Sequence, residues 1–215
     1  MNKVTSLDAA MNLIKDGMSI MVGGFMAAGT PEPFMDALVA RGVKDLTIIC
    51  NDAGFPDKGV GKLIANGQVK HLMATHIGLN PMAGKLMNSG AMKVDLIPQG
   101  TFAERIRAGG FGIGGFLTPT GVGTVVAEGK QVITLDGRDY LLELPLKADV
   151  ALLKAHTGDP MGNLVYRRTT KNFNIPMAAA AETTIALVDE LAEVGGIDPD
   201  VVHTPGVFVN YVVKG

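Results

Sequence analysis

The sequence predicts an α/β fold: a doubly wound, mainly parallel sheet with helices on both faces and a small antiparallel insert. Three observations favour this class. Short apolar runs with the length of buried strands alternate with helical stretches through the first half of the chain. The 215 residues are 47% hydrophobic, which is enough for one buried core, so we expect a single domain over residues 1–215. Asp136-Gly137 separates two extended runs, and this dipeptide favours a hairpin.

The first half carries the elements expected of βαβ units. Near the N-terminus, an amphipathic helix places four apolar side chains on one face: Leu7, Ala10, Met11 and Ile14. A second helix is expected from Pro31 to Arg41, ended by Gly42. The expected strands are Ser19–Gly23, Leu46–Cys50, His71–Thr75 and Lys93–Ile97.

The pattern changes in the second half. The hairpin is expected within Ile133–Leu144. Further strands are expected at Asp149–Lys154, Leu164–Arg168, Thr184–Val188 and Val207–Val213, with Pro160, Pro176, Pro199 and Pro205 at the joins. We find no internal repeat, linker or low-complexity tract.

Composition excludes several classes of function. The net charge is −2, from 19 basic and 21 acidic residues, so no basic field favours nucleic acid or anionic lipid as a partner. Cys50 is the single cysteine, which rules out an internal disulfide framework and a cysteine-based metal cluster, and a reducing compartment such as the cytoplasm is expected. The N-terminus does not read as a signal peptide, and the apolar stretches are too short to span a membrane.

The most informative segment is a glycine turn that follows the first long strand. Glycine makes up 28 of the 215 residues, so turns with close backbone approach are frequent in this chain. Gly23, Gly24 and Gly29 follow Ser19–Val22. Thr30 is then expected as the N-cap of the next helix and Pro31 as its first residue. The amides of such a turn and helix start favour an anion.

Two other strand ends carry polar side chains. Asn51 and Asp52 directly follow Leu46–Cys50, and Gln99 follows Lys93–Ile97. Ligands of open parallel sheets bind outside the carboxyl ends of the strands, so these residues are candidate site residues. The amide of Gln99 could stabilise an oxyanion, ahead of a helix that Thr101 and Glu104 would begin as a capping box. A plain turn at Asn51-Asp52 and a surface position for Gln99 are the alternatives.

Other apparent motifs fail on context. Gly110, Gly112 and Gly115 have the spacing of a dinucleotide loop but follow a helix, and Gly78 to Lys85 lacks the spacing of an ATP loop. The four histidines have no metal-ligand spacing, so no metal site is expected. Arg105 and Arg107 are expected on a solvated helix face, with a phosphate contact as the minority alternative.

The residues from 16 to 31 carry a resemblance to a known family. They read Asp-Gly, an apolar strand, then Gly-Gly-Phe-x-x-x-Gly-x-Pro. This resembles the first half, or alpha subunit, of the two-part coenzyme A transferases that work through an enzyme glutamate. Further similar segments cover essentially the whole chain: Pro98–Gly110, Thr118–Thr124, Asn163-Leu164, Lys171–Asn174 and Thr204–Gly206. Gly29–Pro31, Asn80-Pro81 and Gly114–Leu117 look more like the acetate/acetoacetate branch than the succinate-using branch.

The resemblance implies a ping-pong transfer in which coenzyme A is a substrate and no cofactor is held permanently. An enzyme glutamate attacks the acyl-CoA, and a transient glutamyl-CoA passes coenzyme A to a second carboxylic acid. By this resemblance Gln99 would be an oxyanion donor. Asn51 and Asp52 are expected to face the substrate because of their position at a strand end. The coenzyme A contacts would come from the turn, namely Gly24, Phe25, Met26, Ala27, Ala28, Gly29 and Thr30.

The glutamate itself is missing, because the family places it in a Ser-Glu-x-Gly segment of the second half. Glu193-Val194-Gly195 copies part of this pattern, but Ala192 replaces the serine, and we interpret it as a decoy. We therefore expect an alpha subunit that needs a beta subunit, in an α2β2 assembly acting on short-chain acyl-CoA and carboxylates such as acetate, acetoacetate or butyrate. The alternatives are the A subunit of a succinyl-CoA:3-ketoacid transferase, a phosphosugar isomerase-like enzyme and a coenzyme A or nucleotide sensor.

Overall fold

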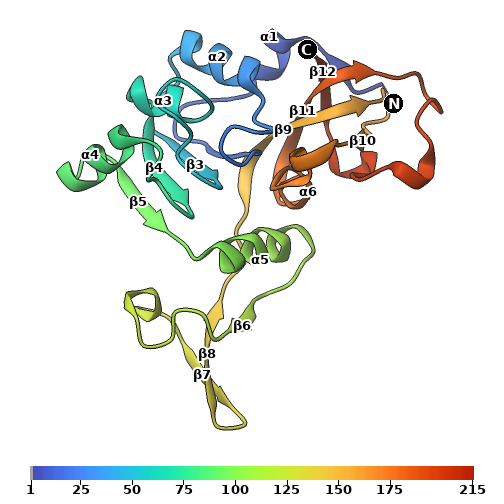
Figure 1. Cartoon of the computed structure of the whole chain (residues 1–215). Helices are drawn as coiled ribbons and strands as arrows, with labels where there is room; N and C mark the ends of the chain where they lie inside the picture. Colours follow the sequence, from blue (N-terminus) through green and yellow to red (C-terminus); the bar gives the residue numbers. More distant parts are fainter. Residues whose placement is uncertain (1) are drawn as a thin grey trace.

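The computed structural model describes residues 2–215, and within them nine strands form the main sheet (Figure 1). The order is β1-β12-β11-β9-β2-β3-β4-β5, and every neighbouring pair on this path is parallel. β10 adds to β9 in the antiparallel sense. The bounds are β1 (Val4–Thr5), β2 (Ser19–Val22), β3 (Leu46–Cys50), β4 (Val69–Ala74), β5 (Lys93–Leu96), β9 (Ala148–Gly158), β10 (Leu164–Val165), β11 (Ala181–Leu191) and β12 (Tyr211–Lys214).

Helices cover both faces of this sheet, as the sequence predicts. α1 (Leu7–Met11), α2 (Glu32–Arg41), α3 (Gly61–Ala65) and α4 (Pro81–Ser89) pack on one face, and α5 (Gln99–Gly110) and α6 (Asn174–Met177) on the other. Successive strand residues point to opposite faces, so Ile20 and Val22 lie in the first core while Met21 lies in the second. The four short 3₁₀ turns are η1 (Val125–Ala127), η2 (Arg168–Lys171), η3 (Pro199–Val201) and η4 (Gly206–Phe208).

A small antiparallel sheet forms the expected insert. β6 (Phe116–Thr118), β7 (Val132–Leu135) and β8 (Arg138–Glu143) pair in the order β6-β8-β7. Asp136 and Gly137 have φ of 49° and 74°, which is the left-handed turn that the dipeptide favours. Figure 1 shows this sheet projecting away from the main sheet beyond α5.

Three sequence expectations in this fold are wrong. Leu164–Arg168 is a strand only as far as Val165, because Arg168 turns the chain into η2 with a φ of 50°. Val207–Val213 is extended only from Tyr211, because η4 comes first. The helix after β5 begins at Gln99 rather than at a capping box, because the carbonyl of Pro98 already accepts the N–H of Phe102.

The strand order places the reversal point of the sheet between β2 and β9. The chain winds from β2 through β3, β4 and β5 in one direction, and from β9 through β11 and β12 in the other. In doubly wound sheets the crevice at such a reversal, outside the carboxyl ends of the strands, is where ligands bind. The loops after β2, β3 and β9 therefore lie where a ligand site is expected. No helix in residues 2–215 is long and apolar enough to cross a bilayer.

We predict that Leu152→Ala strongly destabilises the full chain. Leu152 is completely buried on β9 beside Val22, at the centre of the first core. Truncating it leaves a cavity in the middle of the sheet, so the free energy of unfolding in urea should fall by about 3 kcal/mol. Val125→Ala, at a side chain that is 79% exposed, is the control and should change it by less than about 0.5 kcal/mol. Similar losses in both variants would contradict this account of the core.

Candidate active site

The glycine turn after β2 is a tight hairpin. Phe25 and Ala28 exchange both backbone hydrogen bonds, with N···O distances of 3.1 and 2.9 Å. Met26 and Ala27 form the two-residue turn with φ of 49° and 63°, in the left-handed region that non-glycine residues rarely occupy. Such strain persists only where the surroundings enforce it, and it gathers at functional sites.

Thr30 does not cap the following helix, which corrects the sequence prediction. α2 begins at Glu32 with Pro31 at the N-cap position, and no side chain caps it. Thr30 instead packs against the start of the hairpin, since a Cβ on Gly24 would lie 2.2 Å from Thr30 Oγ1. Gly24 also has a φ of 127°, so this position requires glycine on two counts.

A second hairpin of the same kind follows β3. Phe55 and Lys58 exchange both backbone hydrogen bonds at 3.2 Å, between Gly54 and Gly59. The two segments share the pattern Gly-Phe-x-x-x-Gly, so the expectation of no internal repeat is wrong. β2 and β3 are parallel neighbours in the sheet, and their hairpins therefore lie next to each other at its carboxyl edge.

The Asp52 carboxylate bridges the two hairpins. Its Oδ2 accepts from the Met26 N–H and from Asn51 Nδ2, both at 2.8 Å, and its Oδ1 accepts from the Gly54 N–H at 2.9 Å. The residue is only 6% exposed, so these three donors replace the water that a buried carboxylate would otherwise need. The turn does attract an anion, but in this structure that anion is the chain's own Asp52. The space behind it is about 10 Å³, room for one water molecule.

Gln99 joins the same network from a third strand end. It is the first residue of α5, and its Nε2 donates to Asn51 Oδ1 at 2.8 Å. The structure thus connects Gln99, Asn51, Asp52 and the glycine turn through consecutive hydrogen bonds. The side chain of Asn51 is buried, which disfavours a plain solvent-facing turn there. Gln99 is exposed, and because a carboxamide has two N–H groups, one remains for a ligand.

The first hairpin is held on its other side by two asparagines that the sequence analysis gave no role. Asn174 is fully buried, and its Oδ1 accepts the Lys154 N–H at 2.9 Å while its Nδ2 donates to the Gly29 carbonyl at 3.0 Å. A Cβ on Gly23 would lie 1.9 Å from Asn174 Oδ1. Asn172 Nδ2 donates to the Ala28 carbonyl at 2.9 Å. The sequence signal for these two residues is the family-like segment Lys171–Asn174 that contains them.

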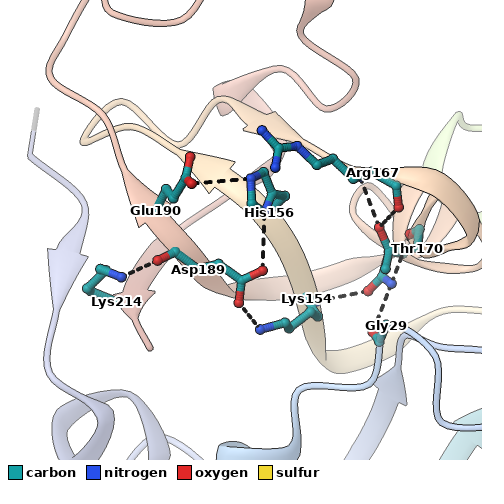
Figure 2. A network of polar contacts seen from close by, with 9 residues as sticks. Gly29, Lys154, His156, Arg167, Thr170, Asp189, Glu190 and Lys214 are labelled. Carbon is teal, nitrogen blue, oxygen red and sulfur yellow. Dashed lines mark hydrogen bonds and ion pairs between the residues drawn. The ribbon is translucent and has the colours of Figure 1, made fainter.

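A charged cluster continues from this clamp along β9 and β11 (Figure 2). Lys154 connects the two, because its backbone binds Asn174 while its ammonium group binds Asp189. His156 lies between two carboxylates. Its Nδ1 is 3.3 Å from Asp189 Oδ2, and its Nε2 is 3.4 Å from Glu190 Oε1. Burial alone would raise the pKa of Asp189, but the hydrogen bonds and charges of Lys154 and His156 outweigh this and lower it.

Other candidate groups lie outside the network. Burial and the nearby Asp52 charge raise the pKa of the Cys50 thiol, so Cys50 is not an activated nucleophile. Glu193 lies in an exposed turn after β11, and no hydrogen bond or ion pair given for residues 2–215 joins its carboxylate to the hairpins. The sequence predicts a solvated helix face for Arg105 and Arg107. Arg107 lies on such a face, with its side chain 46% exposed. The Arg105 side chain is only 19% exposed, and its Nε donates to the Leu144 carbonyl at 2.9 Å.

We predict that Asn174→Asp loosens the first hairpin. The carboxylate still accepts the Lys154 N–H but faces the Gly29 carbonyl without a donor, so the free energy of unfolding should fall by about 2 kcal/mol. Hydrogen exchange at the Phe25 and Ala28 amides should accelerate about tenfold or more relative to the wild type. Asn88→Asp, at an exposed position on α4, is the control. Unchanged protection of both amides would show that Asn174 does not hold the turn.

Comparison with known proteins identifies the family of the chain. The family model described as Coenzyme A transferase matches residues 4–215. The alpha subunit of acetate CoA-transferase from Escherichia coli (strain K12) is 53% identical over 211 residues, covering 98% of this chain and 96% of the relative. The alpha subunit of the acetoacetyl-CoA:acetate/butyrate CoA transferase of Clostridium acetobutylicum is 49% identical over 213 residues, covering 99% and 98%.

A solved structure agrees on the fold. The acyl-CoA transferase of Escherichia coli O157:H7, crystallised as a thioester complex with coenzyme A, superposes with a TM-score of 0.86 at 22% identity. The match covers 100% of this chain and 47% of that one, so this chain spans about half the length of the solved enzyme. The fold predicted from sequence is confirmed by this likeness. The chain belongs to the coenzyme A transferase family.

Proposed function

We propose that the chain is the alpha subunit of a transferase that moves coenzyme A between a short-chain acyl-CoA and a free carboxylate such as acetate, acetoacetate or butyrate. The observation that carries this is the match, over nearly the full length of both chains, to two relatives that are themselves named alpha subunits of such enzymes. The hydrogen-bonded network of Gln99, Asn51 and Asp52 at the sheet edge supports this proposal, because the Gln99 amide is a suitable hydrogen-bond donor to an oxyanion.

The proposed reaction is a double displacement. A glutamate carboxylate of the partner attacks the thioester carbonyl, and coenzyme A leaves as the thiolate, giving an acyl-glutamyl anhydride. The thiolate then attacks the glutamyl carbonyl and releases the first carboxylate, which leaves glutamyl-CoA. A second carboxylate repeats these steps in reverse and leaves as the new acyl-CoA. A glutamate near its ordinary pKa of about 4.3 is ionised at pH 7, so no activating base is needed.

This chain would stabilise the negative oxygen that each attack creates. The remaining N–H of Gln99 is a candidate donor, and the hydrogen bond to Asn51 fixes the orientation of its amide before the substrate arrives. Asn51 is fixed in turn by Asp52, which also holds the Met26 amide. The two hairpins would form the wall along which the coenzyme A arm lies, with Gly24 to Thr30 as its contact segment.

The nucleophile would come from a beta subunit. Glu193 is the one Glu-x-Gly match in the sequence, and no hydrogen bond or ion pair given for residues 2–215 joins its carboxylate to Gln99, Asn51 or Asp52. Gln99 is exposed, which leaves its amide open to a group presented by a second chain. An α2β2 assembly acting in the cytoplasm would combine the oxyanion donor of this chain with the nucleophile of the beta subunit.

The assay that tests this function is transfer of coenzyme A from acetoacetyl-CoA to acetate. We expect turnover by the chain co-purified with the product of its neighbouring gene and none by the chain alone. Turnover by the lone chain would place a nucleophile within it and return attention to Glu193. Turnover with succinyl-CoA but not with acetoacetyl-CoA and acetate would favour the succinate-using alternative instead.

Gln99→Ala should lower kcat of the co-purified enzyme by about 100-fold or more, because loss of one preorganised oxyanion donor costs about 3 kcal/mol in the transition state. The KM for acetoacetyl-CoA should change little, since the donor acts mainly on the tetrahedral oxygen. Gln131→Ala, at an exposed position before β7, is the matched control. An unchanged kcat with a lowered melting temperature would assign Gln99 a structural role only.

A further inference from the structure

The small antiparallel sheet has an open strand edge. β7 lies at the end of the order β6-β8-β7, and β8 is its one strand partner among residues 2–215. Figure 1 shows the hairpin of β7 and β8 pointing away from the main sheet. Val132 and Leu135, the two ends of β7, are each 49% exposed. The outer edge of β7 therefore faces solvent.

This edge presents backbone hydrogen-bonding groups to solvent. The Leu142 N–H donates to the Gln131 carbonyl at 2.9 Å, so Gln131 bonds inward to β8. Bonded and non-bonded pairs alternate along an antiparallel ladder. Ile133 therefore also bonds inward, whereas Val132 and Thr134 direct their N–H and C=O groups outward. Outward groups of this kind are a template for a further strand.

Other edge strands of the chain are protected against such pairing. β5 carries the charges of Lys93 and Asp95. β1 and β10 have two residues each, and β6 has three, with Pro119 directly after it. Charge, proline and short length are the usual protections of an edge. β7 reads Val-Ile-Thr-Leu, with neither charge nor proline, and its pairing with β8 is regular, which is typical of a strand that pairs with a partner.

Opposite charges lie at the two ends of this edge. Lys130 precedes β7, and its Nζ is 2.5 Å from Oε1 of Glu143 on β8. Asp136 follows β7 in the turn, and no ion pair given for residues 2–215 involves its carboxylate. The nearby Arg138 guanidinium lies over the Tyr140 ring, 5.5 Å from its centroid. The edge thus has a cation at its start and an unpaired anion at its end.

This order of charges fits a second copy of the same strand. Two copies of one edge that pair in the antiparallel sense are related by a two-fold axis. An axis at Ile133 places Lys130 of each copy opposite Asp136 of the other. Moving the axis by one residue to either side places Lys130 opposite Arg138 or Thr134 instead. Only the axis at Ile133 brings opposite charges together, which favours this register.

The same register joins two apolar faces. Side chains alternate between the faces of a sheet, so Ile133, Tyr140 and Leu142 share one face, where they are half-buried. Leu141 belongs to the opposite face and is completely buried. An axis at Ile133 makes the two Ile133 residues direct neighbours, so pairing extends the apolar face from one copy into the next.

We propose that β7 pairs with β7 of a second copy of this chain, antiparallel about a two-fold axis at Ile133, so that the two small sheets become one continuous sheet. The inference follows from the outward backbone groups, the uncharged strand and the order of the charges at its ends. It supplies a contact between alpha subunits in the proposed α2β2 assembly. It concerns assembly and not the reaction, so it is tested on the full-length chain alone, separately from the transferase assay.

Single cysteines test the register. Residues directly opposite in a non-hydrogen-bonded pair have Cα atoms about 4.5 Å apart, within the range of a disulfide. With diamide as oxidant, we expect Ile133→Cys to give about tenfold more covalent dimer than Leu135→Cys. Leu135→Cys is the matched control, because its two copies would lie about 14 Å apart along the paired strands. The wild type, whose single Cys50 is buried, should give no covalent dimer.

A proline at position 134 tests the backbone hydrogen bonds. Thr134→Pro removes an outward N–H, and an edge strand tolerates proline at such a position, so the hairpin with β8 should remain. Thr134→Val keeps the N–H but loses the same hydroxyl, which donates to Asp139 Oδ1 at 2.6 Å, and is the control. We expect the dissociation constant of the dimer, measured by sedimentation equilibrium, to be about tenfold or more higher for the proline variant than for the valine variant.

Other results would overturn the proposal. More covalent dimer from Val132→Cys or Thr134→Cys than from Ile133→Cys would refute the register. Equal dissociation constants for the proline and valine variants would place the dimer contact on another surface. A wild-type chain that sediments as a monomer, together with no covalent dimer from any of the cysteine variants, would show that the edge of β7 does not pair with a second copy.

Discussion

The arrangement at the sheet edge depends on one buried anion, the carboxylate of Asp52. It follows β3 directly and accepts hydrogen bonds from both hairpins and from Asn51, which in turn binds Gln99. An unpaired carboxylate at this depth would be costly, so the three donors and the carboxylate stabilise one another only when all are in place. Asp52 therefore connects the ends of β2 and β3 directly, and the start of α5 through Asn51.

The opposite side of the first hairpin depends on the other half of the chain. Asn172 and Asn174 bind the carbonyls of Ala28 and Gly29, although these pairs are separated by 144 and 145 positions in sequence. The pairing of β2 with β9 makes this possible, because it brings the second half of the chain to the reversal point of the sheet. The contacts that hold the hairpin on this side therefore come from the half of the chain that follows it.

The sequence predicted what depends on local pattern. The apolar runs gave the parallel strands, Asp136-Gly137 gave the small hairpin, and the rule about strand ends selected Asn51, Asp52 and Gln99. The prediction failed where contacts between residues far apart in the sequence determine the local structure. That Asp52 fills the turn and that Asn174 holds it from behind cannot be read from spacing. The capping box failed because the N–H of Phe102 is already bonded to Pro98, and Thr101 is buried within the first turn of α5.

The side chains of the strained turn carry one more argument. Met26 and Ala27 occupy left-handed backbone conformations that glycine would adopt at lower cost, in a chain that uses glycine freely elsewhere. The conformation is kept instead by the Asp52, Asn172 and Asn174 contacts, so the strain is balanced before any ligand arrives. The strained backbone thus presents the Met26 side chain at an exposed tip, where it is 44% accessible. Because the turn is already held by these contacts, a group that touched this tip would require little further ordering of the backbone.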